Sequence, residues 1–324
     1  MDLLGGHSIG AWLAFNGLIL ALLALDLGII HRKARVVGLR EALIWNVVWI
    51  LAALAFWQVV IRLYGTQSGL EYLTGYVIER ALSVDNIFLF VVIFRYFAVP
   101  AEHQRRVLYW GILGALVMRG GFILAGAALV AAFHWVLYAF GVFLVWSGVH
   151  LLWDQDAAPE PDRNPLVRLA VRIFPVTPKF HGPRFLVRLK DGWHATPLLV
   201  VLLVVETTDL MFALDSIPAI FGITRDPFII YTSNVFAILG LRAMYFLVAA
   251  LLPHFRFLKQ GLSAILVLIG VRMLTESFVD IPTGLTLAVV CAILGAAAVA
   301  SWLFPASRAK KAAKDGRSGR SASG

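Results

Sequence analysis

Residues 196–224, TPLLVVLLVVETTDLMFALDSIPAIFGIT, decide the fold class of this chain. The segment is apolar at both ends and is longer than the roughly 20 helical residues that cross the hydrocarbon core of a bilayer. Its centre nevertheless carries three carboxylates, Glu206, Asp209 and Asp215. Each ionised carboxylate near the bilayer centre costs at least about 2.5 kcal/mol on insertion scales. A chain that keeps three there needs a compensating interaction, and a bound cation or a proton in transit would supply it.

The composition of the whole chain indicates a membrane protein with several spans. Of its 324 residues, 60% are hydrophobic, and the mean hydropathy is +0.83, whereas a soluble domain is about 45–50% apolar. The single cysteine, Cys291, excludes an internal disulfide and a cysteine-based zinc or iron–sulfur site. The net charge of +9 is better explained by Lys and Arg in cytoplasmic loops than by nucleic-acid binding, so no nucleic-acid partner is predicted.

Hydrophobic stretches predict an all-α polytopic bundle of about nine transmembrane helices. Lys and Arg concentrate in every second connection between these stretches, so the positive-inside rule places the N-terminus outside and the C-terminus in the cytoplasm. The first stretch lacks the flanks of a cleaved signal peptide and is expected to stay as a helix. The predicted spans lie near residues 10–30, 41–63, 72–97, 106–130, 132–152, 197–222, 229–252, 258–275 and 284–304.

The spans group into units separated by polar connections. The long connection is rich in proline and turns from acidic to basic, which predicts a cytoplasmic loop with an amphipathic surface segment around 166–174. The end of the chain is rich in Ala, Lys, Gly, Ser and Arg, which predicts disorder. The predicted units are 1–71 (two helices), 72–152 (three helices), 153–196 (the loop), 197–275 (three helices), 276–305 (the last span) and 306–324 (the basic tail).

Two segments of the chain resemble each other and predict an inverted repeat. ERALSVDNI (79–87) aligns with DLMFALDSI (209–217), and weaker matches follow downstream. Spans three to five therefore correspond to spans six to eight. Because the charge rule has the two triplets begin on opposite sides, they would be inverted, as in secondary transporters with a substrate site near the midplane. The alternative is a chance similarity between apolar helices.

The acidic motifs predict an all-oxygen cation site. Glu79 and Asp85 are six residues apart, as are Asp209 and Asp215, and six residues turn about 600° on a regular helix, so the members of a pair would not share a face. We therefore expect the helices to unwind near Asp85–Asn86 and near Asp215–Ser216, where Pro218 also favours a break. Carboxylate, amide, hydroxyl and freed carbonyl oxygens suit hard divalent ions such as Mn²⁺, Mg²⁺ or Ca²⁺. The predicted ligands are Glu79, Asp85, Asn86, Glu206, Asp209, Asp215 and Ser216, with Asp26 as a further candidate.

Other interpretations of these polar residues stay open. The acids could be structural, paired with the buried arginines Arg80, Arg119 and Arg242. Asp26 could line a cytoplasmic vestibule or lie at the membrane interface. Asn234 could be a ligand or a helix cap.

Four stretches of the chain resemble the signature segments of the TerC family of bacterial membrane proteins. They are LALDLGIIHRKAR, ERALSVDNIF, VETTDLMFALDSIPAIFGIT and YTSNVFAILGLRAMYFL, within residues 10–280. The family is named for tellurite resistance and includes manganese exporters. The resemblance implies a multi-pass protein of the bacterial inner membrane that exports Mn²⁺. It also implies that Glu79, Asp85, Asn86, Glu206, Asp209 and Asp215, and Asp26 as a further candidate, occupy the family's acidic positions.

The leading hypothesis is therefore a secondary transporter that exports divalent metal by alternating access in exchange for protons. The chain has no P-loop motif, so ATP is not expected to drive it; no enzyme activity and no tightly bound cofactor are expected. An alternative is a membrane anchor for tellurite-resistance or metal-stress proteins that acts through loop 153–196 without transport. A third is an intramembrane aspartyl hydrolase in which Asp85 and Asp215 share a proton, although the G-x-G-D motif of such proteases is absent. No oligomeric state is predicted.

Overall fold

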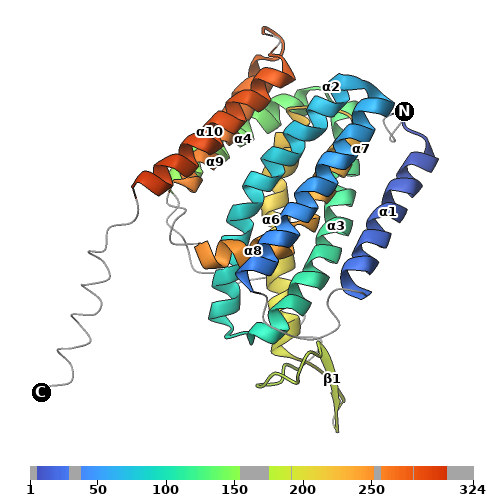
Figure 1. The fold of residues 1–324 in the computed structure, drawn as a ribbon, viewed down its shortest axis with the longest axis vertical. Coiled ribbons are helices and arrows are strands. Elements are labelled where there is room, and N and C mark those ends of the chain that lie inside the picture. The colour runs from blue at the N-terminus through green and yellow to red at the C-terminus, as the bar shows by residue number, and fades with distance from the viewer. Residues whose placement is uncertain are drawn as a thin grey trace, which may run out of the picture.

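The chain folds into helices packed side by side, with a small β-hairpin at one end (Figure 1). The computed structural model describes residues 6–28, 38–153, 175–190, 192–251, 257–279 and 281–304. This architecture confirms the predicted all-α bundle. Its described helices are α1 (Ile9–Gly28), α2 (Leu39–Tyr96), α3 (Ala101–Ala132), α4 (Trp135–Trp153), α6 (Pro197–Phe221), α7 (Pro227–Leu239), α8 (Leu241–Leu251), α9 (Leu258–Thr275) and α10 (Thr283–Leu303).

The described helices are long and apolar enough for a multi-pass membrane protein. Six of them are long and apolar enough to cross a membrane: α2, α3, α4, α6, α9 and α10. The bent pair α7–α8 would make a seventh span. The outer surface of the bundle carries large apolar side chains, among them Leu51, Val117 and Trp146, each more than half exposed. In water such a surface would aggregate, whereas in lipid it faces the solvent that suits it.

Helix α2 is a helical hairpin and provides the second and third predicted spans. The two spans are joined without a loop, and the helix is interrupted only at Gly65, whose φ of 91° suits glycine. Tyr72 donates a hydrogen bond to the carbonyl of Ala53 at 3.3 Å, although 19 residues of straight helix would span about 28 Å. The chain therefore turns back at Gly65, and the first arm (39–64) packs against the second arm (66–96).

The seventh predicted span is bent by 45° between α7 and α8. Arg80 of the second arm of α2 lies at the bend, so close to Gly240 that a Cβ on this glycine would collide with the guanidinium. Arg80 donates to the carbonyl of Ala237 at 3.3 Å and to the side-chain oxygen of Asn46 at 2.6 Å. Arg80 thus satisfies a carbonyl at the end of α7, one of the groups that a helix terminus leaves without a partner.

Both acidic helices stay regular where unwinding was predicted. The second arm of α2 is helical through Asp85 and Asn86, and α6 is continuous to Phe221 with Pro218 inside it. The prediction of unwinding near Asp85–Asn86 and Asp215–Ser216 is therefore wrong. Pro218 is tolerated because it lies in the last turn, where the helix is about to end and a kink disturbs little of it.

The predicted loop 153–196 contains a β-hairpin that was not predicted. Strands β1 (Leu186–Leu189) and β2 (Gly192–Ala195) pair antiparallel. The hydroxyl of Thr196 donates to the carbonyl of Arg184 at 2.7 Å, which ties the hairpin to the start of α6. The end of the bundle that carries β1 and β2 is called the hairpin end below, after this β-hairpin. The opposite end, where α2 turns back, is called the Gly65 end. The predicted amphipathic segment 166–174 and the predicted disordered tail 306–324 lie outside the described residues.

The helices that the predicted repeat matches with each other run antiparallel. Helices α4 and α9 approach closely at glycines: Gly141 packs on Gly270, and Gly148 accepts a 2.5 Å hydrogen bond from Ser263. Glycine permits such backbone contact between membrane helices. The inverted repeat itself stays a prediction.

The second arm of α2 and α6 form the other antiparallel pair. Gly75 packs against Ile220 near the Gly65 end, whereas Phe90 and Val205 line one void nearer the hairpin end. Apolar clusters fill the bundle on both sides of this pair's middle, one around Ile78 and Ile220 and another around Phe90 and Val205. The polar residues of the acidic motifs lie between them.

The predicted orientation can be tested with single cysteines in a Cys291→Ser background. Thr66 lies at the Gly65 end and Lys190 at the hairpin end, and both are exposed. A membrane-impermeant thiol reagent added to intact cells should label Thr66→Cys, and it should label Lys190→Cys only after the cells are opened. Labelling of both residues from the same side would contradict the two-sided topology.

Candidate functional site

Arg119 of α3 lies in the centre of the bundle and pairs with two of the predicted acids. Its side chain is 1% exposed, its Nη1 contacts Oε1 of Glu79, and its Nε and Nη2 donate to the two oxygens of Asp209 at 3.1 Å each. Ser216 accepts a further hydrogen bond from Nη1 at 3.3 Å. The fork-shaped contact with Asp209 is the geometry in which an arginine–carboxylate pair is strongest. For Glu79 and Asp209 the structure therefore matches the alternative of acids paired with a buried arginine.

Regular helix geometry divides the acids into two sets. Six residues turn a helix by about 600°, which leaves Asp85 about 240° away from Glu79 and Asp215 equally far from Asp209. Glu79 and Asp209 accordingly face Arg119, whereas Asp85 and Asp215 face away from it. The sequence predicted that the two acids of each helix do not share a face, and we expected the helices to unwind for this reason. In the structure the helices stay regular, and the two sets of acids have different surroundings.

Asp85 and Asp215 line one cavity of about 600 Å³ between the second arm of α2, α4, α6 and α9. Asn86 and Ser216, both 2% exposed, line it as well. Ser147 donates a hydrogen bond of 2.8 Å to Asp215. Oδ1 of Asn86 has no hydrogen-bond partner among the described residues. Four of the predicted ligands thus share one cavity.

Four polar residues of this cavity were not predicted from the sequence: Thr208 of α6, and Ser147, His150 and Lys259. The last three lie on α4 and α9, which carry no acidic motif. Ser147 and His150 are three residues apart, a spacing that puts both on one helix face, and this was the only signal that could have found them. Lys259 brings a positive charge to a cavity that also holds two carboxylates.

The two cavity aspartates are staggered along the bundle axis. Gly75 packs against Ile220, and Glu79 and Ser216 each lie four residues from that contact toward the hairpin end, so they mark one level of the antiparallel helices. Asp85 lies six residues from that level toward the hairpin end, and Asp215 lies one residue from it in the same direction. The difference of five residues corresponds to roughly 8 Å at 1.5 Å per residue.

Glu206 belongs to neither set. It precedes Asp209 by three residues and shares its face of α6, as predicted. Its carboxylate lies against Gly114 of α3, where a Cβ would collide with it. Its Oε2 has no hydrogen-bond partner among the described residues. The glycine makes room for a buried carboxylate that the described side chains do not fully satisfy.

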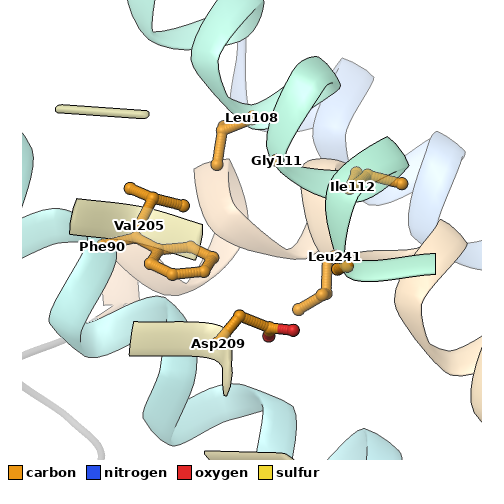
Figure 2. Close-up of a pocket in the computed structure, with 8 residues that line it drawn as sticks. Phe90, Leu108, Gly111, Ile112, Val205, Asp209 and Leu241 are labelled. Atoms are coloured by element: carbon orange, nitrogen blue, oxygen red, sulfur yellow. The ribbon is translucent and has the colours of Figure 1, made fainter. Parts of the chain in front are cut away.

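A small void adjoins Asp209 on the α3 side (Figure 2). Its volume is about 10 Å³, room for about one water. Apart from Asp209 its lining is apolar, with Phe90 and Leu241 on two sides. The void is too small and too apolar for an ion, so the cavity with Asp85 and Asp215 is the candidate site.

The predicted ligands do not converge on one point. Within the described residues, no three His, Cys, Asp or Glu side chains are placed so that they could hold a metal ion. The candidate ligands do not lie together because the cavity aspartates are staggered and because Glu79 and Asp209 are bonded to Arg119. Asp26 lies in the last turn of α1, and its side chain is outside the description. The metal-ligand roles stay a prediction.

Asn234 does not cap a helix. The N-cap of α7 is Asp226, whose Oδ1 accepts from the backbone nitrogens of Phe228 and Ile229 at 2.9 and 3.4 Å. Asn234 lies in the middle of α7 and is 1% exposed. Of its two predicted roles, the cap is therefore wrong.

Comparison with known proteins gives one family and several close relatives. The family model described as "Integral membrane protein TerC family" matches residues 64–311. The "Uncharacterized membrane protein STKORF319" of Myxococcus xanthus is 50% identical over 292 residues, which are 90% of this chain and 92% of that protein. The "Putative membrane-bound redox modulator Alx" of Escherichia coli (strain K12) is 44% identical over 292 residues, 87% of this chain and 91% of that protein. No solved structure matches the chain.

The buried ion pairs of Arg119 predict a large stability effect. Arg119→Met leaves Glu79 and Asp209 buried without their cation, and breaking a buried pair in this way costs about 3–5 kcal/mol. The same substitution combined with Glu79→Gln and Asp209→Asn removes the charges together and should recover most of the loss. Thermal unfolding of the purified protein in detergent measures both.

The exposed pair between Arg225 and Glu276 provides the control. The two side chains are 47% and 55% exposed, and an exposed pair contributes about 0–1 kcal/mol. Arg225→Gln should therefore unfold close to the wild-type temperature. An Arg119→Met protein as stable as Arg225→Gln would contradict the assigned pairing.

Proposed function

We propose that this chain, which belongs to the TerC family of integral membrane proteins, is a secondary transporter that exports divalent metal ions, with Mn²⁺ as its principal substrate. The observation that carries the proposal is the cavity of about 600 Å³ that Asp85 and Asp215 line from two antiparallel helices. Ionisable side chains within membrane spans most often mark the path of an ion or a proton. The inner membrane of a bacterium, with the C-terminus in the cytoplasm, is the proposed location.

The size of the cavity suits a hydrated ion. At about 30 Å³ per water molecule, an ion with six waters takes up about 180 Å³. The cavity has room for this. Mg²⁺ gives up its waters reluctantly and is usually bound through one or two carboxylates, and Mn²⁺ prefers the same oxygen ligands. Aspartates staggered by roughly 8 Å suit an ion that keeps part of its water and moves from one to the other.

The donor set favours a hard cation. Carboxylates, the amide oxygen of Asn86 and the hydroxyl of Ser216 are oxygen donors, which favour hard divalent ions over zinc or copper, and they outnumber the one imidazole of the cavity, that of His150. Oδ1 of Asn86 is buried without a partner among the described residues, and an unmade hydrogen bond of this kind costs about 1–3 kcal/mol. A cation in the cavity would satisfy it. The choice of Mn²⁺ within this class rests on the family resemblance.

Some relatives are named as redox modulators. This chain has a single cysteine, Cys291 on α10, so disulfide exchange between two of its own thiols is not available to it. Nothing in the cavity favours redox chemistry over ion binding, and transport is the proposal that accounts for the buried acids.

The proposal predicts that neutralising either cavity aspartate abolishes transport. In vesicles containing the purified protein, Asp85→Asn and Asp215→Asn should each slow Mn²⁺ uptake at least tenfold, because each removes a charged oxygen ligand while keeping the shape of the side chain. A vesicle interior more acidic than the bath should speed uptake by the wild type if protons are exchanged.

The matched control is Glu276→Gln, which neutralises an exposed acid away from the cavity and should transport normally. Equal Mn²⁺ uptake by the wild type and both aspartate variants, at equal protein per vesicle, would reject the cavity as the ion path. Competition by Mg²⁺, Ca²⁺ and Zn²⁺ in the same assay defines the selectivity.

A further inference from the structure

Asn234 is a buried amide whose polar atoms make no hydrogen bond to the described residues. It is 1% exposed, and neither its Oδ1 nor its Nδ2 has a hydrogen-bond partner among the described residues. Buried polar groups in proteins are nearly always bonded, and each one left unmade costs about 1–3 kcal/mol. Because Asp226 caps α7, a capping role does not account for the polar side chain of Asn234.

The packing of α3 on α7 places Asn234 level with Arg119. Ile123 and Ile230 share the apolar cluster nearer the Gly65 end, whereas Ile112 and Leu241 line the small void on the other side (Figure 2). The helices therefore run antiparallel, and the four residues from Ile123 back to Arg119 correspond to the four from Ile230 on to Asn234.

The stripe of α7 that carries Asn234 joins two of the apolar clusters of the bundle. Ile230, Asn234 and Ile238 follow one another at intervals of four and so form one stripe. Ile230 belongs to the cluster that contains Ile123, and Ile238 belongs to the cluster that contains Ile112. Asn234 lies between two residues that both belong to clusters containing α3 side chains.

Arg119 incompletely balances the carboxylates that surround it. It is one positive charge bonded to two carboxylates, those of Glu79 and Asp209, and Oε2 of Glu79 keeps no partner among the described residues. Ser216 is bonded to Arg119 and also lines the cavity. A cation in the cavity would therefore lie next to the hydrogen bonds that Arg119 makes, because Ser216 belongs to both.

We propose that Arg119 is a movable counter-ion with two positions. In the position seen here it occupies Glu79 and Asp209. When a divalent cation passes from the cavity onto these carboxylates, Arg119 releases them and donates to Oδ1 of Asn234. The carboxylates then pair with the cation, and Asn234 gives the displaced guanidinium a hydrogen-bond acceptor in place of them. This inference rests on the proposed transport function and adds a residue that never touches the ion.

Asn234→Leu tests the second position. Leucine has nearly the shape of asparagine, and replacing an unpaired buried amide with an apolar side chain removes a cost rather than a bond. The variant should unfold at or above the wild-type temperature and yet take up Mn²⁺ at least tenfold more slowly in vesicles. A purely structural Asn234 could not give both results together.

Two further variants sharpen the test. Thr232→Val makes a similar polar-to-apolar change on the same helix, at a hydroxyl that bonds its own helix at Phe228, and should transport normally. Asn234→Gln keeps an amide oxygen and should restore part of the activity that Asn234→Leu loses.

Each outcome decides something different. An Asn234→Leu protein that transports like Thr232→Val, or one that unfolds well below the wild type, overturns the second position and leaves the proposed function standing. A wild-type protein that moves no Mn²⁺ in the same vesicles overturns the proposed function, and this inference with it. The inference is supported if Asn234→Leu is at least as stable as the wild type and takes up Mn²⁺ slowly, while Thr232→Val takes it up at the wild-type rate.

Discussion

One guanidinium, that of Arg119, holds the carboxylates of two antiparallel helices in the centre of the bundle. Moving three charged groups out of water is expensive, and their attraction returns that free energy only in good geometry. The geometry here is specific: one side chain from α3 reaches Glu79 on α2 and Asp209 on α6. The contact therefore fixes the rotation of both acidic helices about their axes. Once those rotations are fixed, residues six positions further along, Asp85 and Asp215, point away from Arg119 and into the wider cavity.

This division gives similar residue types two different environments. The acids on Arg119 are buried and partly balanced by its single positive charge, whereas Asp85 and Asp215 line a cavity with room for water. Because each helix carries one acid of each kind, a small rotation of either helix would change both environments together. Arg80, which lies against Gly240 at the bend between α7 and α8, follows Glu79 directly in sequence. The second arm of α2 thus touches both the central ion pairs and the most distorted span of the bundle.

Much of the fold could be predicted because hydropathy reports directly on burial in lipid, and the described helices lie where apolar stretches were found. The joined arms of α2 were harder to foresee, since a helical hairpin needs only one glycine with positive φ and Gly65 is one of several candidates. The β-hairpin before α6 was missed because prolines and charges dominate its surroundings. At the site, residue types and six-residue spacing identified the acids, but not their division, which depends on a partner from α3. Ser147, His150 and Lys259 come from helices whose sequences carry no comparable signal.

The charge balance around Arg119 bears on why a divalent rather than a monovalent ion would be selected. Glu79 and Asp209 carry two negative charges and Arg119 one positive charge, and four hydrogen bonds join the guanidinium to its partners. A monovalent ion that replaced Arg119 would restore the same net charge and forfeit those hydrogen bonds, so the exchange would be unfavourable. A divalent ion neutralises both carboxylates, and in a medium of low dielectric constant the second charge interacts strongly at short range. Under the proposed transport function, a resident arginine would therefore raise the threshold for entry above what Na⁺ or K⁺ can meet, and would discriminate between ions through competition rather than through the size of the site.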